Sequence, residues 1–404
     1  MRVVRVLSIL EPGGAQLAIA RLSRELRRRG VETRVLAGSA TREGIELLEA
    51  AGVEVDAWTE QPPLPTAAAS PELQYACSEE FVSWLAPRLR GADIVHAHMF
   101  GAWWAAAMAV PDGVPLAASE HNAVRWPDAP RHDEMRAALA RVDRFFAHGP
   151  ATGRMVLELG YPRERLRRGV SPVEPGRPRP LAGLPVPRIV FAGRLHEEKG
   201  PDLLIDAVSR MRVPPPTQML GAGPGMSELR EQVARLGLEG TVRFWGWRSG
   251  VGRWLARASA CVVPSRHEAW SQTAVLAMRL GVPVVGTAVE GLPLTLHRRR
   301  GVLVPPEDPE ALARAIEDVV SGRVRPDLRR ARRYAGSFTP RRVATLYARE
   351  YLALSSQREA PIALARAAPL PVAGSPPSGP ASMRSRSRRR GAHPYDRVAA
   401  APTG

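Results

Sequence analysis

Two basic side chains stand close together in the segment 191–200, which reads FAGRLHEEKG. Arg194 follows a short apolar strand, and Lys199 comes five residues later at the start of a helix. Cations fixed at the end of a strand can absorb the charge that builds on a departing diphosphate, without a metal ion. The alternative is that both cations only pair with neighbouring carboxylates between Glu197 and Asp202.

Lys199 is the only lysine of the chain, and Asn122 is the only asparagine. Arginine has replaced almost all lysine, as is typical of bacterial proteins encoded by GC-rich genomes. An ammonium and a guanidinium are not interchangeable where geometry matters, so a retained lysine indicates a site residue. Survival by chance is the alternative.

A second segment, residues 264–286, carries a strand, a loop and a helix that begins near Ser271 and Gln272. Free backbone N–H groups and the positive end of the dipole make a helix start a ready phosphate site. We therefore expect Ser271, Gln272 and Thr273 to bind the nucleotide, and Glu268 to accept hydrogen bonds from sugar hydroxyls. Glu268 could instead only stabilise the helix start.

The elements that must position these residues alternate between strand and helix. Apolar strands are predicted at 2–9, 32–37, 53–58, 93–98, 115–121 and 144–148, and again at 188–192, 217–221, 242–246, 260–264, 283–287 and 301–304. Amphipathic helices separate them, which is typical of βαβ units and parallel sheets. The fold class is therefore α/β, with two facing Rossmann-like, doubly wound domains. Ligands bind such sheets beyond the carboxyl ends of the strands, so the active site should be an interdomain cleft.

The predicted boundaries follow composition. Residues 1–175 form an acceptor-binding domain, and 176–187 form a Pro/Gly-rich linker. Residues 188–336 form a nucleotide-sugar-binding domain, which a closing helix at 337–355 follows. Residues 356–404 are rich in Pro, Ala, Ser and Arg and should be a disordered basic tail.

Several motifs, taken in order, resemble one family. They are a GGAQ loop, GRL-HEEKG, GAGPG at 221–225, FWGW at 244–247 and PSRHEAWSQTAVLAMRLGVPVVGT from residue 264. Together they are similar to the retaining glycosyltransferases of the GT-B fold, family 4 (glycosyl transferases group 1). The resemblance runs from Val3 to about Val320.

The resemblance implies roles for individual residues. Arg194 and Lys199 would bind the donor diphosphate, and Glu268 would contact the transferred sugar. Gly13 and Gly14 would let the first loop approach donor and acceptor closely, which suits glycine. His121 in SEHN matches the histidine that faces the reacting sugar; otherwise it only caps a neighbour at the strand end.

Two further residues are expected near the nucleotide. Gly223 lies in the GAGPG turn between strand and helix, although such turns are often only tight connections. Trp247 ends the FWGW strand and would border the base, although tryptophans on a strand are more often core residues.

The sequence departs from the family pattern at Leu276, where a ribose-binding glutamate is usual, and at Leu294, where an acidic residue is common. The loop 269–273 also lacks its usual glycines. Donor identity therefore stays open. Two alternatives follow: a nucleotide-sugar epimerase of the same fold, and a non-catalytic relative.

The formal charge of +17 raises a nucleic-acid alternative. Eight arginines and two acids from Arg358 onward assign +6 to the tail, and no helix-turn-helix or aromatic RNA-binding motif accompanies the rest. We expect no specific nucleic acid and at most peripheral membrane contact. The N-terminus lacks a signal-peptide layout, so the cytoplasm is expected.

Metals and cofactors are not expected. Cys77 and Cys261 have no CxxC spacing, and His96 and His98 lack a nearby third ligand. The nucleotide-diphosphate sugar would be a co-substrate. The acceptor, whether a natural product, a lipid carrier or a polysaccharide, matches no diagnostic motif.

Overall fold

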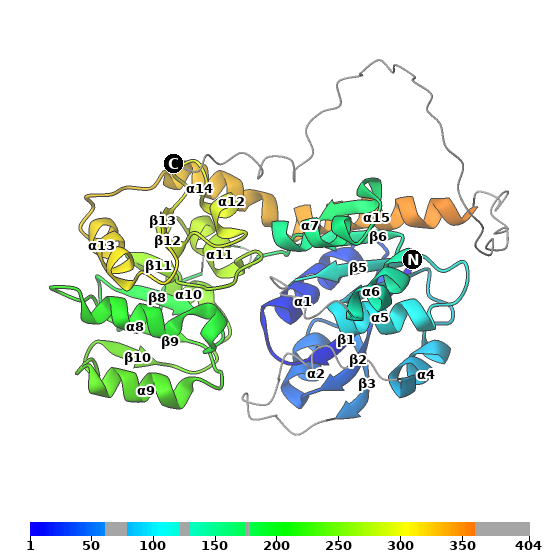
Figure 1. Cartoon of the computed structure of the whole chain (residues 1–404), viewed down its shortest axis with the longest axis horizontal. Coiled ribbons are helices and arrows are strands. Elements are labelled where there is room, and N and C mark those ends of the chain that lie inside the picture. The colour runs from blue at the N-terminus through cyan, green and yellow to red at the C-terminus, as the bar shows by residue number, and fades with distance from the viewer. Residues whose placement is uncertain (61–78, 122–129, 174–175, 177, 360–404) are drawn as a thin grey trace, which may run out of the picture.

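The computed structural model describes residues 1–60, 79–121, 130–173, 176 and 178–359, and these form two parallel sheets (Figure 1). The first sheet has the strand order β3-β2-β1-β4-β5-β6-β7. Its strands are β1 (Arg2–Leu10), β2 (Glu32–Ala40), β3 (Glu54–Glu60), β4 (Ile94–His98), β5 (Leu116–Glu120), β6 (Arg144–Ala147) and β7 (Leu166–Arg168). Its helices are α1 (Gly14–Arg27), α2 (Arg42–Glu49), α4 (Glu79–Arg88), α5 (Phe100–Ala109), α6 (Pro130–Ala140) and α7 (Pro150–Glu158).

The second sheet has the order β10-β9-β8-β11-β12-β13. Its strands are β8 (Ile189–Ala192), β9 (Thr217–Leu220), β10 (Val242–Phe244), β11 (Ala260–Val263), β12 (Val284–Thr287) and β13 (Val302–Val304). Its helices are α8 (Pro201–Ser209), α9 (Met226–Arg235), α10 (Val251–Leu255), α11 (Gln272–Leu280), α12 (Leu292–Leu296), α13 (Pro309–Val320) and α14 (Leu328–Ala335). The predicted pair of doubly wound domains is confirmed.

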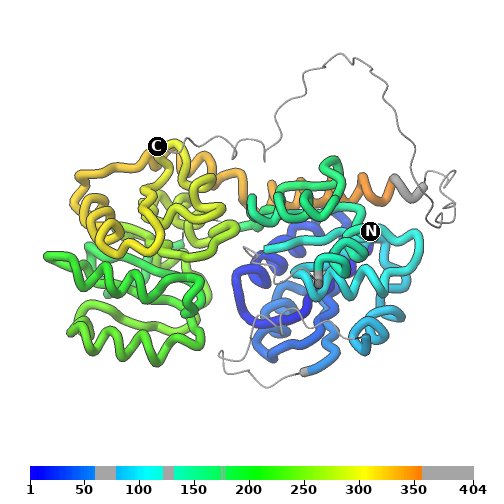
Figure 2. Tube along the Cα trace, viewed as in Figure 1, coloured from blue at the N-terminus to red at the C-terminus, as the bar shows by residue number. Residues whose placement is uncertain are grey.

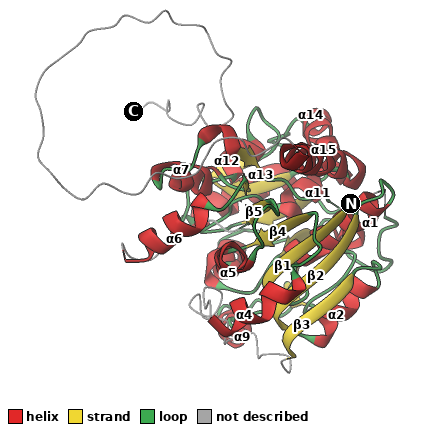
Figure 3. Cartoon of the chain, turned by 90° about the vertical axis from the view of Figure 1, so that its right-hand side faces the viewer, coloured by secondary structure: helices red, strands yellow, loops and turns green. Residues whose placement is uncertain are grey.

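Helices cover both faces of the first sheet. Helices α1 and α2 lie on one face, and α4 and α5 lie on the other (Figure 3). The central strands therefore have both faces buried, and every residue of β4 and β5 is buried. This explains the nearly continuous apolar runs from which the strands were predicted. The short edge strand β7 was not predicted, because only Leu166 of its three residues is buried.

The last helix, α15 (Pro340–Glu359), returns to the first domain. Figure 2 traces this path from α14 to the orange helix that packs beside α1. Tyr347 and Tyr351 of α15 are buried, and Tyr347 Oη donates to the carbonyl of Val170 over 3.2 Å. Where the chain crosses between the domains for the second time, Phe338 accepts a backbone hydrogen bond from Val173 over 3.0 Å. The two crossings are thus tied together.

None of the described helices combines the length and the apolar character that crossing a bilayer requires. Most of the predicted basic tail, from residue 360, lies outside the described residues.

Candidate active site

The predicted site residues follow the carboxyl ends of strands in both domains. Helix α1 begins at Gly14 after β1, and helix α11 begins at Gln272 after β11. These two helix starts meet, because a Cβ atom on Gly14 would lie 3.2 Å from Gln272 Nε2. A second contact joins the domains where Gly149, the N-cap of α7, touches Ala269. The loops that carry the motifs therefore face one another.

Arg194 leaves β8 just beyond Ala192 and is half exposed, at 51% of its side chain. Its Nη2 donates to Glu198 Oε2 over 3.2 Å, so the local ion pair anticipated as an alternative does form. Burial raises the pKa of Glu11, in the first loop of the opposite domain, and the charge of Arg194 opposes that rise. The charge of Arg194 in the second domain therefore interacts with Glu11 in the first loop of the first domain. An exposed pair with Glu198 is worth at most about 1 kcal/mol, so a ligand can compete for the guanidinium.

Lys199 pairs with Glu268, another predicted site residue, and not with the carboxylates next to it in the sequence. Its Nζ donates to Glu268 Oε2 over 3.1 Å and to the carbonyl of His267 over 3.4 Å. The Lys199 side chain is 24% exposed and that of Glu268 is 12% exposed. Asp202, an alternative partner, instead binds Arg266 through two hydrogen bonds of 2.7 and 2.8 Å. The structure thus brings Lys199 and Glu268 into one partly buried ion pair.

Glu290 supports this pair and was not predicted. Its Oε2 accepts from the backbone N–H of Glu268 over 2.9 Å, and its Oε1 lies 3.1 Å from His267 Nδ1. Its backbone has φ 42°, in the left-handed region, just before Gly291. Its position after the carboxyl end of β12, at the same sheet edge as Glu268, is the signal that could have identified it.

The start of α11 is held by its own side chains. Ser271 is the N-cap, and its Oγ accepts from the N–H of Ala274 over 3.2 Å. Thr273 Oγ1 donates to the carbonyl of Ala192 at the end of β8 over 2.9 Å. Ser271 and Thr273 therefore fix the helix start against the strand that leads to Arg194. Gln272 extends toward the first domain.

Gly223 fits closely against the loop that carries Arg194. A Cβ atom on Gly223 would overlap the backbone of Leu195. Leu195 N donates to Ala222 O over 2.9 Å, and Gly225 N donates to Leu195 O over 3.0 Å. The GAGPG turn therefore holds the GRL loop in place, and contact between Gly223 and a nucleotide stays a prediction.

The two tryptophans of FWGW have different surroundings. Trp245 donates from Nε1 to Gln218 Oε1 over 2.7 Å, and its ring centroid lies 4.7 Å from that of Trp254. Trp247 is 39% exposed beyond the end of β10. Trp245 therefore has the packing role that was the alternative, whereas Trp247 has an accessible surface.

His121 lies with His98 and His148 at the carboxyl ends of β4, β5 and β6. Its Nε2 lies 2.9 Å from His98 Nδ1, and its ring centroid lies 3.9 Å from that of His148. Burial, followed by the charge of Arg5, lowers the pKa of His121 to about 4. The ring is therefore neutral at physiological pH. Asn122, which follows it in the sequence, lies outside the described residues.

The departures from the family pattern have structural counterparts. Leu276 is 7% exposed and belongs to the apolar core around α11. Leu294 is partly exposed on the short helix α12. Neither position offers a carboxylate to a nucleotide ribose. Cys261 is buried on β11, and Cys77 lies outside the described residues.

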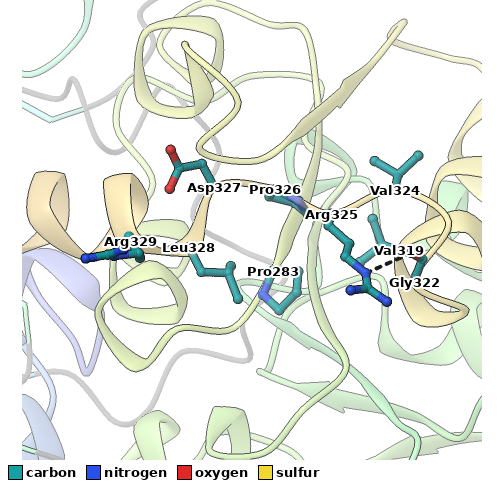
Figure 4. Close-up of a pocket in the computed structure, with 9 residues that line it drawn as sticks. All are labelled: Pro283, Val319, Gly322, Val324, Arg325, Pro326, Asp327, Leu328 and Arg329. Carbon is teal, nitrogen blue, oxygen red and sulfur yellow. Dashed lines mark hydrogen bonds between the residues drawn. The ribbon is translucent and has the colours of Figure 1, made fainter.

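Among the residues that the structure describes, no group of three or more His, Cys, Asp or Glu side chains is arranged to hold a metal ion. A pocket of about 460 Å³ lies elsewhere, between Pro283 and the segment from Val319 to Arg329 (Figure 4). Pro283 precedes β12, so this pocket is at the amino edge of the second sheet. It contains none of the predicted site residues.

Comparison with known proteins agrees with this arrangement. The family model "Glycosyltransferase Family 4" matches residues 12–204, and "Glycosyl transferases group 1" matches residues 186–321. The D-inositol 3-phosphate glycosyltransferase of Jonesia denitrificans is 35% identical over 172 residues, which are 39% of this chain and 41% of that protein. Its counterpart in Streptomyces griseus is 32% identical over 266 residues, 58% of this chain and 56% of that protein. The chain thus aligns with about half the length of these relatives.

A solved structure extends the likeness over both domains. Anabaena Alr3699/HepE, in complex with UDP and glucose, has a TM-score of 0.73 and 20% identity over 87% of this chain and 99% of that one. At this identity the likeness concerns the fold. The two consecutive family matches, on a chain with this two-sheet fold, place the protein among the GT-B glycosyltransferases of family 4 and group 1.

Proposed function

We propose that the protein transfers a sugar from a nucleotide-diphosphate sugar to an acceptor hydroxyl, with retention of anomeric configuration and without a metal ion. The observation that carries the proposal is that the start of α11 contacts both the start of α1 and the strand end that leads to Arg194, while Lys199 is paired with Glu268 just before that helix. Two cations and two helix starts supply positive potential from both domains. A diphosphate is the ligand that such a site favours.

The leaving group gains charge as the glycosidic bond breaks. Arg194 is half exposed in a weak ion pair, so it can turn to the diphosphate without a large cost. Lys199 is held by Glu268 and is already oriented before the ligand arrives. Preorganised charge of this kind lowers the barrier because little reorganisation is needed during the reaction.

Glu268 suits a sugar-binding role better than a nucleophilic one. Its Oε2 accepts hydrogen bonds from both Lys199 Nζ and Ser265 Oγ, at 3.1 and 3.3 Å. Its other oxygen can accept from sugar hydroxyls. We propose that the acceptor attacks from the face that the diphosphate leaves, and that a phosphate oxygen takes the acceptor's proton. Retention would then need no covalent sugar–enzyme intermediate.

The first experiment is a thermal-shift screen of UDP, GDP, ADP and TDP with their sugars. UDP-glucose is the first donor to try, because HepE was solved with UDP and glucose. D-inositol 3-phosphate is the first acceptor to try, because it appears in the names of two relatives. A stabilising donor should then yield a product whose anomeric configuration is read by NMR, with and without EDTA.

Three results would contradict the proposal at different levels. Stabilisation by none of these nucleotides would favour a non-catalytic relative, which the buried Leu276 also suggests. Conversion of the donor alone, without acceptor, would identify an epimerase. An inverted product, or complete inactivation by EDTA, would overturn the retaining or the metal-independent part.

A further inference from the structure

A buried polar cluster lies beneath His121 in the first domain. Arg5 on β1 is fully buried, and no carboxylate lies within ion-pair distance of it among the described residues. Its partners are His98 on β4, at 2.8 Å from Nη1 to Nε2, and Tyr351 on α15, at 3.0 Å from Nη2 to Oη. Burying a guanidinium without a counter-ion costs free energy, so the hydrogen bonds that Arg5 donates are needed to offset that cost.

The direction of each hydrogen bond in this cluster follows from Arg5. A guanidinium can only donate, so His98 Nε2 must accept. A neutral imidazole that accepts at Nε2 carries its proton on Nδ1. His98 Nδ1 therefore donates to His121 Nε2, which lies 2.9 Å away. His121 Nε2 must accept, and the proton of the His121 ring must be on Nδ1.

A second branch from Arg5 is consistent with this assignment. Tyr351 Oη accepts from Arg5 and is left with its own proton to donate to His96 Nδ1, at 2.6 Å. His96 then carries its proton on Nε2, which donates to Ser119 Oγ at 2.8 Å. Arg5 Nη1 also lies 3.4 Å from His96 Nδ1, which again requires that this nitrogen accept. Each nitrogen and oxygen in these hydrogen bonds therefore has a donor or acceptor role that agrees with those of its partners.

These hydrogen-bond directions hold for neutral imidazole rings, and the surroundings of the rings keep them neutral. Burial above all, together with the charges of neighbouring groups that include Arg5, lowers the pKa of His96 and that of His98 well below the ordinary value. His121 is also fixed in orientation, since its ring packs between those of His98 and His148, with centroid distances of 5.2 and 3.9 Å. A Cβ atom on Gly169 would overlap the His148 ring, so that ring too is closely packed.

We infer that Arg5 and His98 are positioning residues that fix His121 as its Nδ1–H tautomer. Nδ1 is the ring's remaining polar atom, and the described residues provide no partner for it. His121 is partly exposed, whereas His98 is buried. His121 therefore offers a hydrogen-bond donor to an oxygen of its ligand. The assignment of that oxygen to the donor sugar rests on the proposed function. The assignment of the tautomer rests only on the hydrogen bonds and does not depend on the proposed function.

The tautomer can be read directly in the full-length protein. Histidine labelled with ¹⁵N, recorded in long-range ¹H–¹⁵N spectra near neutral pH, distinguishes a protonated from an unprotonated ring nitrogen. His121→Gln and His98→Gln variants assign the signals. We expect His121 to be protonated at Nδ1 and His98 also at Nδ1. A His121 signal from the Nε2–H tautomer, or from an imidazolium, overturns the inference.

A matched pair of substitutions at position 98 tests the causal step. His98→Asn can still donate to His121 Nε2 with its amide group while its oxygen faces Arg5. His98→Asp can only accept, so His121 must then carry a proton on Nε2. We expect the Asn variant to keep the Nδ1–H signal and the Asp variant to lose it. An unchanged His121 tautomer in a folded Asp variant would show that His98 does not set it.

Activity separates this inference from the proposed function. The Asp variant should lose at least tenfold in kcat/KM relative to the Asn variant, because His121 Nδ1 can no longer donate as a neutral ring. A switched tautomer without any transfer activity in the unsubstituted protein would refute the proposed function and leave the tautomer assignment intact. Should the Asp variant not fold, the spectrum of the unsubstituted protein alone decides.

Discussion

Lys199 Nζ lies 3.1 Å from Glu268 Oε2, and this ion pair joins two loops that are 69 residues apart in the sequence. One loop follows β8 and the other follows β11, which are neighbouring strands of the second sheet. The chain's only lysine is therefore held by the carboxylate expected to contact the transferred sugar. The ammonium group of Lys199 is therefore held next to Glu268, where we expect the ligand to bind.

Removal of either cation should abolish most of the transfer. We expect Arg194→Ala and Lys199→Ala each to lower kcat by about 100-fold or more, the size of effect seen when one preorganised donor is removed. Lys199→Arg should also lose activity, because a planar guanidinium cannot reproduce an ammonium held by Glu268. Initial rates with saturating donor measure this.

The matched control is Arg230→Ala on the exposed surface of α9, which removes the same charge from a position outside the motif loops. It should retain full activity. Circular dichroism should show all of these variants folded. Full activity in both Arg194→Ala and Lys199→Ala would remove their assignment.

Gly223 should tolerate no side chain. Because a Cβ atom there would overlap the backbone of Leu195, Gly223→Ala must displace the loop that carries Arg194. We expect a loss of about 1–3 kcal/mol in the free energy of unfolding, typical of overpacking, together with reduced transfer. Urea unfolding and initial rates report the two effects.

Gly240→Ala provides the comparison, since a Cβ atom at Gly240 would meet nothing within 4 Å. Its stability and activity should match those of the unsubstituted protein. Equal behaviour of the two alanine variants would mean that the GAGPG turn does not hold the Arg194 loop.

Discrimination at the ribose should be weak. Where the resemblance leads us to expect a ribose-binding glutamate, Leu276 is buried in the core. A site built to bind a hydroxyl rejects the analogue without it by about 10⁴-fold or more, whereas a site without that partner does not. We expect kcat/KM for a 2′-deoxynucleotide sugar to fall within about tenfold of the ribonucleotide form. A larger preference would reveal another residue that binds the ribose.

Stability should fall in mild acid. Burial lowers the pKa of His121 to about 4, and lowers those of His96, His98 and His148 well below the ordinary value. The unfolded chain takes up protons on these rings below about pH 6.5, whereas the folded protein does not. The free energy of unfolding is therefore highest above pH 6.5. It should fall as the pH drops toward 4, by roughly 1 kcal/mol per ring for each pH unit.

Urea unfolding at about pH 8 and about pH 5 measures this dependence. His148→Leu removes one of the four rings and a buried Nε2 that has no partner among the described residues. The variant should therefore lose less stability between the two pH values than the unsubstituted protein. An identical pH dependence would show that His148 does not contribute.

The sequence by itself determined the two-domain α/β fold and the main strands and helices, because buried parallel strands leave apolar runs that helical periodicity interrupts. It also indicated Arg194, Lys199 and Glu268 as candidate site residues, since a strand end, a solitary lysine and a helix start are local signals, and their roles stay predictions. The motif resemblance indicated the family that the comparisons then supported.

Only the tertiary structure decided which charges meet. Lys199 pairs with Glu268 and not with Asp202, and Glu290 supports Glu268 from another strand end. The return of α15, which brings Tyr351 to Arg5 across 346 positions, follows from packing and leaves no periodic trace in the sequence. Spacing along the chain reports local geometry, whereas hydrogen-bond partners depend on how sheets and helices pack, and that is set by contacts between distant residues.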